Sequence, residues 1–164
     1  DQWFHSFTLF YVRFIDGNSI KDQQFWSRSI GGNAFNVWSG LAFERICFQH
    51  VEQIKMALGI SGVMSSVYSW VYRPASKEES GVQIDMLIDR NDGVINLCEI
   101  KFSQGKYEIK KKYAEELRQK LAVFQSKTET RKSIFTVMIT TEGLTDNEYA
   151  GDIQNEVVVN DLFA

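Results

Sequence analysis

The sequence predicts an α/β domain in which a central mixed sheet of about four to five strands is flanked by helices. Two kinds of apolar pattern alternate along the chain, in the order helix, three strands, helix, strand, short helix and strand. That order is expected when helices cover the faces of one sheet. Apolar residues make up 44% of the 164 residues and proline occurs once, a composition that favours a compact domain over a disordered chain.

The first 30 residues contain a stripe of aromatic side chains at helical spacing: Trp3, Phe7, Phe10, Tyr11 and Phe14. We expect a packing surface, against the core or an upstream domain; the alternative is a platform on which nucleic-acid bases stack. Because Gly31 and Gly32 end the pattern, we divide the chain into an aromatic helical linker at 1–32 and a main domain at 33–164. The chain opens at Asp1 directly in this pattern, so we expect it to follow an upstream region of a longer protein.

The next pattern predicts a long helix over about 34–58 that ends at Gly59. Three strand-like runs follow it, at about 63–72, 82–88 and 94–102. The residues at 89–93 are mostly turn formers, so the second and third strands should form a hairpin. The polar stretch at 74–81 is expected to be a surface loop.

A second helix is predicted over about 107–126, because four large apolar residues fall on one of its faces: Tyr113, Leu117, Leu121 and Phe124. An apolar strand should follow at 133–140. After Gly143 the chain has a short helix-like stretch, and the run at 157–159 predicts a last strand.

Charge and cysteine content exclude little. The net charge is −3, which by itself indicates no partner. Cys47 and Cys98 have no CxxC pattern or histidine cluster near them, so we expect two reduced, buried thiols in a cytoplasmic protein. We find no targeting segment and expect no membrane contact, because the longest uncharged run, 56–72, contains four serines and two glycines.

The chemically informative residues lie in the predicted hairpin. Even positions of the run at 82–88 are all apolar, so Asp85 should point to the opposite face, together with Gln83. In the next strand Glu99 and Lys101 share one face. If the hairpin pairs as expected, both acids and the lysine can meet near its open end.

Two carboxylates and a lysine are suited to phosphodiester hydrolysis. A divalent cation held by Asp85 and Glu99, with the carbonyl of Ile100 as a possible third ligand, would act as a Lewis acid and activate a water. Lys101 could orient that water or stabilise the developing charge. The alternative is an ordinary ion pair between Glu99 and Lys101 on a solvated strand face.

Glu44 is a further candidate, from the first helix. Projected at 100° per residue, it falls with Leu41, Phe48 and Val51 on the apolar side. A carboxylate buried there is costly unless it is paired or binds a metal. The alternative is a carboxylate at the edge of the stripe that reaches water.

Basic residues are concentrated in one part of the chain. Residues 101–132 hold ten of the 18 Lys and Arg residues against four acids, a local balance of +6. Such a segment could hold the phosphate backbone of DNA without reading its sequence, and we take Lys106 and Lys110 as candidate contacts. The alternative is a solvated helix face supported by pairs such as Glu116–Lys120.

These residues resemble the motifs of the PD-(D/E)xK nuclease superfamily. The similarity is carried by Glu44 in the first helix, by Asp85 in GVQIDMLIDR (81–90), and by Glu99 with Lys101 in INLCEIKFS (95–103). The helix KYAEELRQKLAVF (112–124) lies where the superfamily places its second core helix. More narrowly, the chain is similar to the C-terminal domain of archaeal-type P-loop ATPases, in which an aromatic segment like SFTLFYVRFID (6–16) links a winged-helix region to the nuclease-like domain.

The resemblance implies a restriction-endonuclease-like core of order α-β-β-β-α-β. It also implies an Mg²⁺-dependent DNA endonuclease, with Mn²⁺ as a plausible substitute. Asp85 and Glu99 would be metal ligands, Lys101 the catalytic lysine, and Glu44 the carboxylate that completes the site; Gln83 could contact substrate. No G-x-x-x-x-G-K-[ST] motif occurs, so an ATPase module would lie upstream. The alternative is a catalytically inactive module that keeps the fold to bind DNA or to dock an ATPase.

Overall fold

The protein forms a five-stranded mixed sheet in a computed structural model that describes residues 31–75 and 81–164. The strands are β1 (Ser65–Tyr72), β2 (Val82–Arg90), β3 (Val94–Lys101), β4 (Ser133–Thr140) and β5 (Asn155–Val158). Their spatial order follows their order in the chain. The pairs β1–β2 and β2–β3 are antiparallel, whereas β3–β4 and β4–β5 are parallel. The predicted α/β class with a mixed sheet is therefore confirmed, whereas the predictions for the aromatic segment concern residues outside the described ranges.

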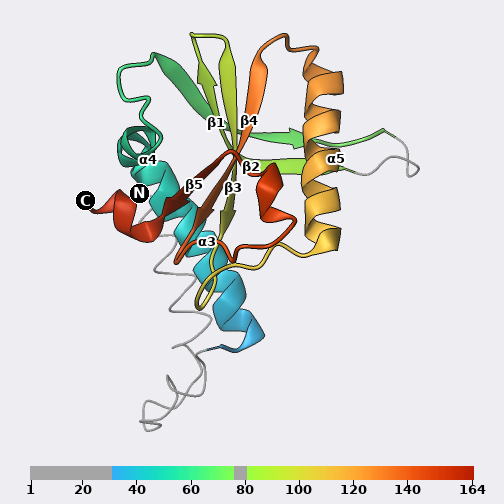
Figure 1. Cartoon of the computed structure of the whole chain (residues 1–164). Coiled ribbons are helices and arrows are strands. Elements are labelled where there is room, and N and C mark those ends of the chain that lie inside the picture. The colour runs from blue at the N-terminus through green and yellow to red at the C-terminus, as the bar shows by residue number, and fades with distance from the viewer. Residues whose placement is uncertain (1–30, 76–80) are drawn as a thin grey trace, which may run out of the picture.

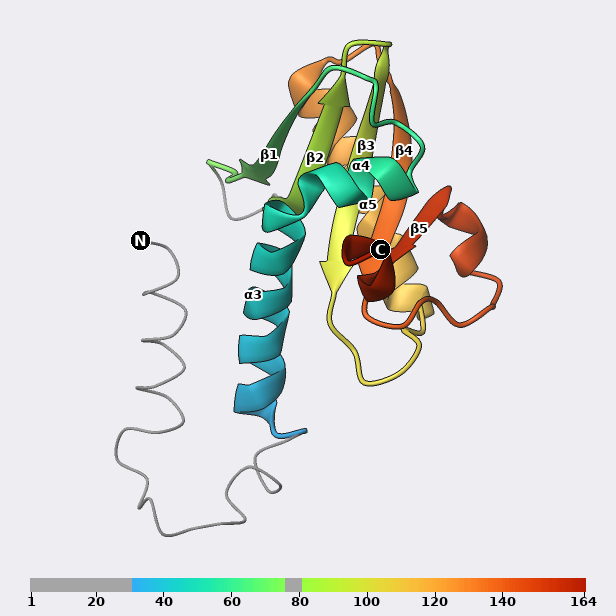
Figure 2. The ribbon, with the colours of Figure 1, turned by 90° about the vertical axis from the view of Figure 1, so that its left-hand side faces the viewer.

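Helices cover both faces of this sheet. They are α3 (Asn33–Gln49), α4 (Val51–Ala57), α5 (Lys111–Thr128) and two short 3-10 helices, Ala150–Asp152 and Val159–Leu162. Figures 1 and 2 show α3 and α4 on one face and α5 on the other. Within the described part of the chain, none of these helices is long and apolar enough to span a bilayer.

The predicted continuous helix over 34–58 is wrong, because the chain bends at His50. There φ is −113° and ψ is 32°, outside the helical region. The imidazole Nδ1 lies 2.8 Å from the carbonyl oxygen of Ile46, and this local hydrogen bond favours a helix end over continuation. Gly59, at φ +70°, follows the end of α4 as predicted.

The hairpin between β2 and β3 is confirmed, and two other boundaries shift. Helix α5 begins later than predicted because Tyr107 is paired with the loop after β4: its N–H donates to the carbonyl of Gly143 at 2.7 Å, and its own carbonyl accepts from Thr145 at 2.9 Å. The last strand ends at Val158, and Val159 begins a 3-10 helix.

Two apolar layers hold the helices to the sheet. On one side, Phe43 and Cys47 of α3 pack in a cluster with buried side chains of β2, β3 and β4. On the other side, Leu117 and Phe124 of α5 are buried, as the predicted apolar face of this helix requires. The central strand β3 is therefore covered on both faces, and polar groups on it are removed from water.

The inside-outside alternation of β2 slips by one residue near its middle. Tyr68 of β1 pairs with Leu87, but Trp70 pairs with Ile84, so β2 spans one residue more than β1 over this stretch. As a result Ile84 and Leu87 lie in the same apolar cluster, while Met86 belongs to the cluster on the α3 side. This is a β-bulge, which bends the strand and redirects side chains.

Candidate functional site

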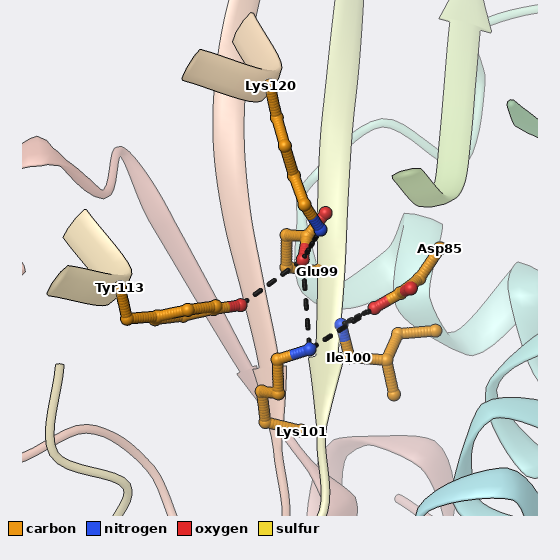
Figure 3. Close-up of polar contacts among 6 residues, drawn as sticks. All are labelled: Asp85, Glu99, Ile100, Lys101, Tyr113 and Lys120. Carbon is orange, nitrogen blue, oxygen red and sulfur yellow. Dashed lines mark hydrogen bonds and ion pairs between the residues drawn. The ribbon is translucent and has the colours of Figure 1, made fainter. Parts of the chain in front are cut away.

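Lys101, at the end of β3, lies between two carboxylates. Its Nζ is 3.8 Å from Oδ2 of Asp85 and 3.8 Å from Oε2 of Glu99, and Figure 3 shows the lysine directed toward both acids. Asp85 comes from β2, and the two strands are antiparallel neighbours. The structure therefore brings together the three hairpin residues that the sequence singled out.

The β-bulge in β2 allows Asp85 to turn toward β3. Regular pairing between β2 and β3 ends at Met86 and Cys98, and beyond it the Oδ2 atom of Asp85 accepts the backbone N–H of Ile100 at 3.0 Å. A backbone donor fixes the buried carboxylate in one place and satisfies one of its oxygens. Ile100 thus contacts Asp85 through its N–H; a metal contact by its carbonyl stays a prediction.

Glu99 is completely buried, with 0% of its surface exposed. Its Oε2 atom accepts hydrogen bonds from Nζ of Lys120 at 2.6 Å and from the hydroxyl of Tyr113 at 3.2 Å, both on α5. Its other oxygen, Oε1, is also buried and has no hydrogen-bond partner within the described residues. Burial, followed by the charge of Asp85, raises the pKa of Glu99, and Lys120 and Lys101 oppose that rise.

Glu44 reaches the same electrostatic environment from α3. It is half-buried; burial and the charge of Asp85 raise its pKa, while the charge of Lys101 lowers it. The predicted apolar side of this helix is wrong, however, since Leu41 and Phe48 are exposed and the buried face of α3 is formed by Ser39, Phe43 and Cys47. Glu44 lies at the edge between the two faces.

Lys101 also touches an aromatic ring and remains open to solvent. Its Nζ lies 5.3 Å from the centre of the Tyr113 ring, within the range of a cation–π contact. About 30% of its side chain is exposed. An ammonium group held between two acids but reachable from outside can contact an incoming anion.

The donor set of the site suits a hard cation. Asp85 and Glu99 offer carboxylate oxygens, and the oxygen of Glu99 that faces Lys101 is Oε2. Mg²⁺ commonly takes one or two protein carboxylates and keeps water for the rest. Among residues 31–75 and 81–164, no group of three or more His, Cys, Asp and Glu side chains is placed to hold a metal, so the fit depends on these two acids.

The remaining candidates lie at the periphery. Gln83 is exposed and pairs with Val71 of β1. The β-bulge lies between Gln83 and Leu87 along β2. Lys106 and Lys110 are exposed in the segment between β3 and α5. Nothing in these positions tests their contact with a substrate, which stays a prediction.

Lys120 and Tyr113 are site residues that the sequence did not single out. The pair Glu116–Lys120, the example given for the alternative of a solvated helix face, does not form: Glu116 pairs with Lys112 at 3.9 Å, and Lys120 turns inward to Glu99. A signal was available, because Tyr113 and Lys120 are seven residues apart and so lie on the same face of a helix. That face is the one that packs on the sheet.

Comparisons with known proteins give the fold little context. No protein-family model matches the chain, and no curated protein is significantly similar to it. Among solved structures, the chain is similar to the crystal structure of AF1548, a protein of unknown function, with 14% identity and a TM-score of 0.47. The similarity covers 71% of this chain and 64% of that protein, so the chain spans under two thirds of its length.

Proposed function

We propose that this chain is a metal-dependent nuclease domain that hydrolyses phosphodiester bonds of DNA. The supporting observation is the meeting of Asp85, Glu99 and Lys101 at one point of the sheet, with Lys101 at 3.8 Å from each acid. Burying charged acids beside a lysine costs desolvation free energy that a purely structural role seldom repays. Such clusters are typical of functional sites.

Each residue has a distinct role in this proposal. Asp85 and Glu99 would hold Mg²⁺, or Mn²⁺ in its place, and Glu44 would complete the acidic side of the site. The bound cation would supply Lewis-acid activation of the phosphate and of a water. Lys101 would donate to the phosphate oxygen on which negative charge develops.

The distribution of charge supports DNA as the substrate. The basic segment at 101–132 begins at the catalytic lysine, and Lys106 and Lys110 are exposed within it. Such residues bind phosphates without reading bases. The proposal includes an upstream ATPase module in the full-length protein and, because Cys47 and Cys98 are free thiols, a cytoplasmic location.

Cleavage assays with matched variants test the proposal. Duplex, branched and single-stranded DNA should be cut only with Mg²⁺ or Mn²⁺, and Asp85→Asn or Lys101→Ala should lower the rate about 100-fold or more. Asp92→Asn changes an exposed acid at the other end of the same hairpin and should leave cleavage unchanged. Absence of metal-dependent cleavage on all three substrates, or full activity in Asp85→Asn, would contradict the proposal.

One observation favours the alternative of an inactive DNA-binding or ATPase-docking module. The Oε2 atom of Glu99 is already bound by Lys120 and Tyr113, so the acid is partly neutralised without any metal. In that case calorimetry should detect no binding of Mg²⁺ or Mn²⁺, and Asp85→Asn should bind DNA as tightly as the unmodified chain.

A further inference from the structure

Helix α3 carries apolar side chains on the face that it turns away from the sheet. Val37 and Leu41 are 58% and 56% exposed there, and Phe48 is 40% exposed. The helix has two charged residues in 17, Glu44 and Arg45. A helix that is apolar on all sides is normally buried on all sides, yet within the described ranges nothing covers this outer face.

The first turns of α3 also lack support from the sheet. Figure 2 shows them extending beyond the end of β3, and the buried positions of the helix begin at Ser39. Most of the stability of a helix in a protein comes from packing of its apolar face. A second packing partner would therefore stabilise this part of α3.

The outer face of α3 has the spacing of a seam between two helices. Four of its residues follow one another in steps of four, three and four: Val37, Leu41, Glu44 and Phe48. Projected at 100° per residue, they fall within about 60° of one another. Steps that alternate between three and four residues are those by which paired helices pack along their length. Glu44 is the one polar member, at the edge of the face.

The aromatic stripe near the N-terminus has the same spacing. Four of its members also follow one another in steps of four, three and four: Trp3, Phe7, Phe10 and Phe14. Each stripe spans about 17 Å of helix, so the two match in length. The stripe lies outside the described residues, and the 18 residues at 15–32 connect it to the start of α3. That connection is long enough for the segment to lie along α3 in either direction.

We propose that residues 3–14 form a helix whose aromatic stripe packs on the outer face of α3, over Val37, Leu41 and Phe48. The contact removes large aromatic and aliphatic side chains from water together. A segment of the same chain is favoured over a separate molecule, because a short connection keeps its effective concentration high. The inference goes beyond the proposed function and holds equally for an inactive module.

Cysteine labelling of the full chain tests the proposal. The natural Cys47 and Cys98 are buried, so an introduced cysteine reports on its own position. Leu41→Cys probes the outer face of α3, and Met64→Cys is the control, because it replaces a residue that is 76% exposed just before β1. Each rate is divided by the rate of the same cysteine in urea. Labelling of Leu41→Cys should then be at least about 10-fold slower than labelling of Met64→Cys.

A segment variant, Phe7→Ser with Phe10→Ser, removes the centre of the aromatic stripe. It should restore fast labelling of Leu41→Cys and leave the rate of Met64→Cys unchanged. Equal rates at the two positions in the otherwise unmodified chain would overturn the proposal, and protection that persists in the segment variant would overturn it too. Protection that appears only at high protein concentration, with a dimer in sedimentation, would assign the face to a second copy. Fast labelling at both positions, with DNA binding lost in the segment variant, would assign the stripe to base stacking.

Urea unfolding gives a second readout that does not depend on labelling. Leu41→Ala should lower the unfolding midpoint of the unmodified chain and should change that of the segment variant much less, because substitutions of residues in contact are not additive. Met64→Ala is the control and should leave both midpoints unchanged. An equal loss from Leu41→Ala in both backgrounds would contradict the proposed contact.

Discussion

Two acids and two lysines share a small volume at the centre of this protein, and burial decides how they interact. Glu99 has no exposed surface, and Lys120 is its closest cation at 2.6 Å. Removing one partner of a buried pair leaves the other charge uncompensated and typically costs about 3–5 kcal/mol. Glu44 differs, because it is half-buried at the edge of α3 and the loss of its charge leaves no cation buried alone.

Replacing Glu44 by glutamine should therefore stabilise the metal-free protein at neutral pH. Burial and the charge of Asp85 raise the pKa of Glu44, so the folded state binds its proton more tightly than the unfolded chain does. The resulting stability is present below the unfolded pKa and is lost as the pH rises through the folded pKa. The advantage of Glu44→Gln in denaturant midpoint should grow between about pH 4 and pH 7.5.

That comparison is made in EDTA, with Glu142→Gln as the control at an exposed position. An advantage of Glu44→Gln that is equal at both ends of this pH range would contradict the expected coupling. A gain in stability with a loss of DNA cleavage would fit the cost in stability that functional residues commonly carry.

The thiols of Cys47 and Cys98 should not react with thiol reagents in the folded protein. Burial raises the pKa of Cys47 to about 12, and it raises the pKa of Cys98 beyond the ordinary range of a thiol. Because only the thiolate reacts, a thiol reagent at about pH 8 should label neither cysteine in the native state and both after unfolding. Rapid labelling of either residue without denaturant would show that the core opens there.

At the scale of single elements, two glycines with different backbone conformations allow a matched comparison of how substitution by alanine changes stability. Gly93, in the hairpin turn, has φ of +87°, whereas Gly40 lies inside α3; an added Cβ would meet no atom within 4 Å at either position. Gly93→Ala should destabilise the protein by about 1–2 kcal/mol through backbone strain, and Gly40→Ala should stabilise it by about 0.5–1 kcal/mol. Urea unfolding measures both, and equal effects of the two substitutions would contradict this account.

Elements with strong patterns were predictable, and those that depend on a single local contact were not. The strand at 133–140 and the apolar face of α5 follow from spacing alone. The bend at His50 depends on its ring reaching the carbonyl of Ile46, which residue type does not reveal. The buried face of α3 could not be predicted from the sequence either. Leu41 and Phe48 are apolar but exposed, so a helical projection that groups apolar residues selects the wrong face.

The candidate site was predictable for a different reason. Asp85, Glu99 and Lys101 are charged residues at buried or half-buried positions of two strands that are rich in apolar residues, a conflict between composition and position that marks functional groups. Tyr113 and Lys120 give a weaker signal: they share one face of α5, but a tyrosine and a lysine on an amphipathic helix are ordinary. Their role depends on how α5 lies against β3, which is tertiary information.

For the whole molecule, the arrangement of charge matters more than its sum. The net charge is −3, yet residues 101–132 carry a balance of +6, while residues 142–164 hold six acids and no Lys or Arg. Arg118 of the basic segment pairs with Asp152 of the acidic one at 2.7 Å, so the two segments adjoin, and the acids partly offset the attraction of a nucleic acid to the bases. Binding of DNA should be weak overall and strongly dependent on salt.

Removing Lys106 and Lys110 tests this expectation. Each substitution by alanine should weaken DNA binding similarly for different sequences and reduce the slope of log K against log salt by about one. Arg131→Ala, at an exposed position in the turn after α5, is the control and should leave the slope unchanged if DNA lies near Lys101. Fluorescence anisotropy across a salt series provides the measurement, and an effect of Arg131 alone would place the DNA elsewhere.

The extra residue in β2 has a consequence for recognising related chains. Because Ile84 and Leu87 face the same layer, deletion of Asp85 would restore regular alternation and leave the buried apolar residues in place. Such a chain would keep the five strands but lose the carboxylate that accepts the hydrogen bond from the backbone N–H of Ile100. A single-residue gap at this point should therefore distinguish relatives that retain only the architecture from those that retain the acid.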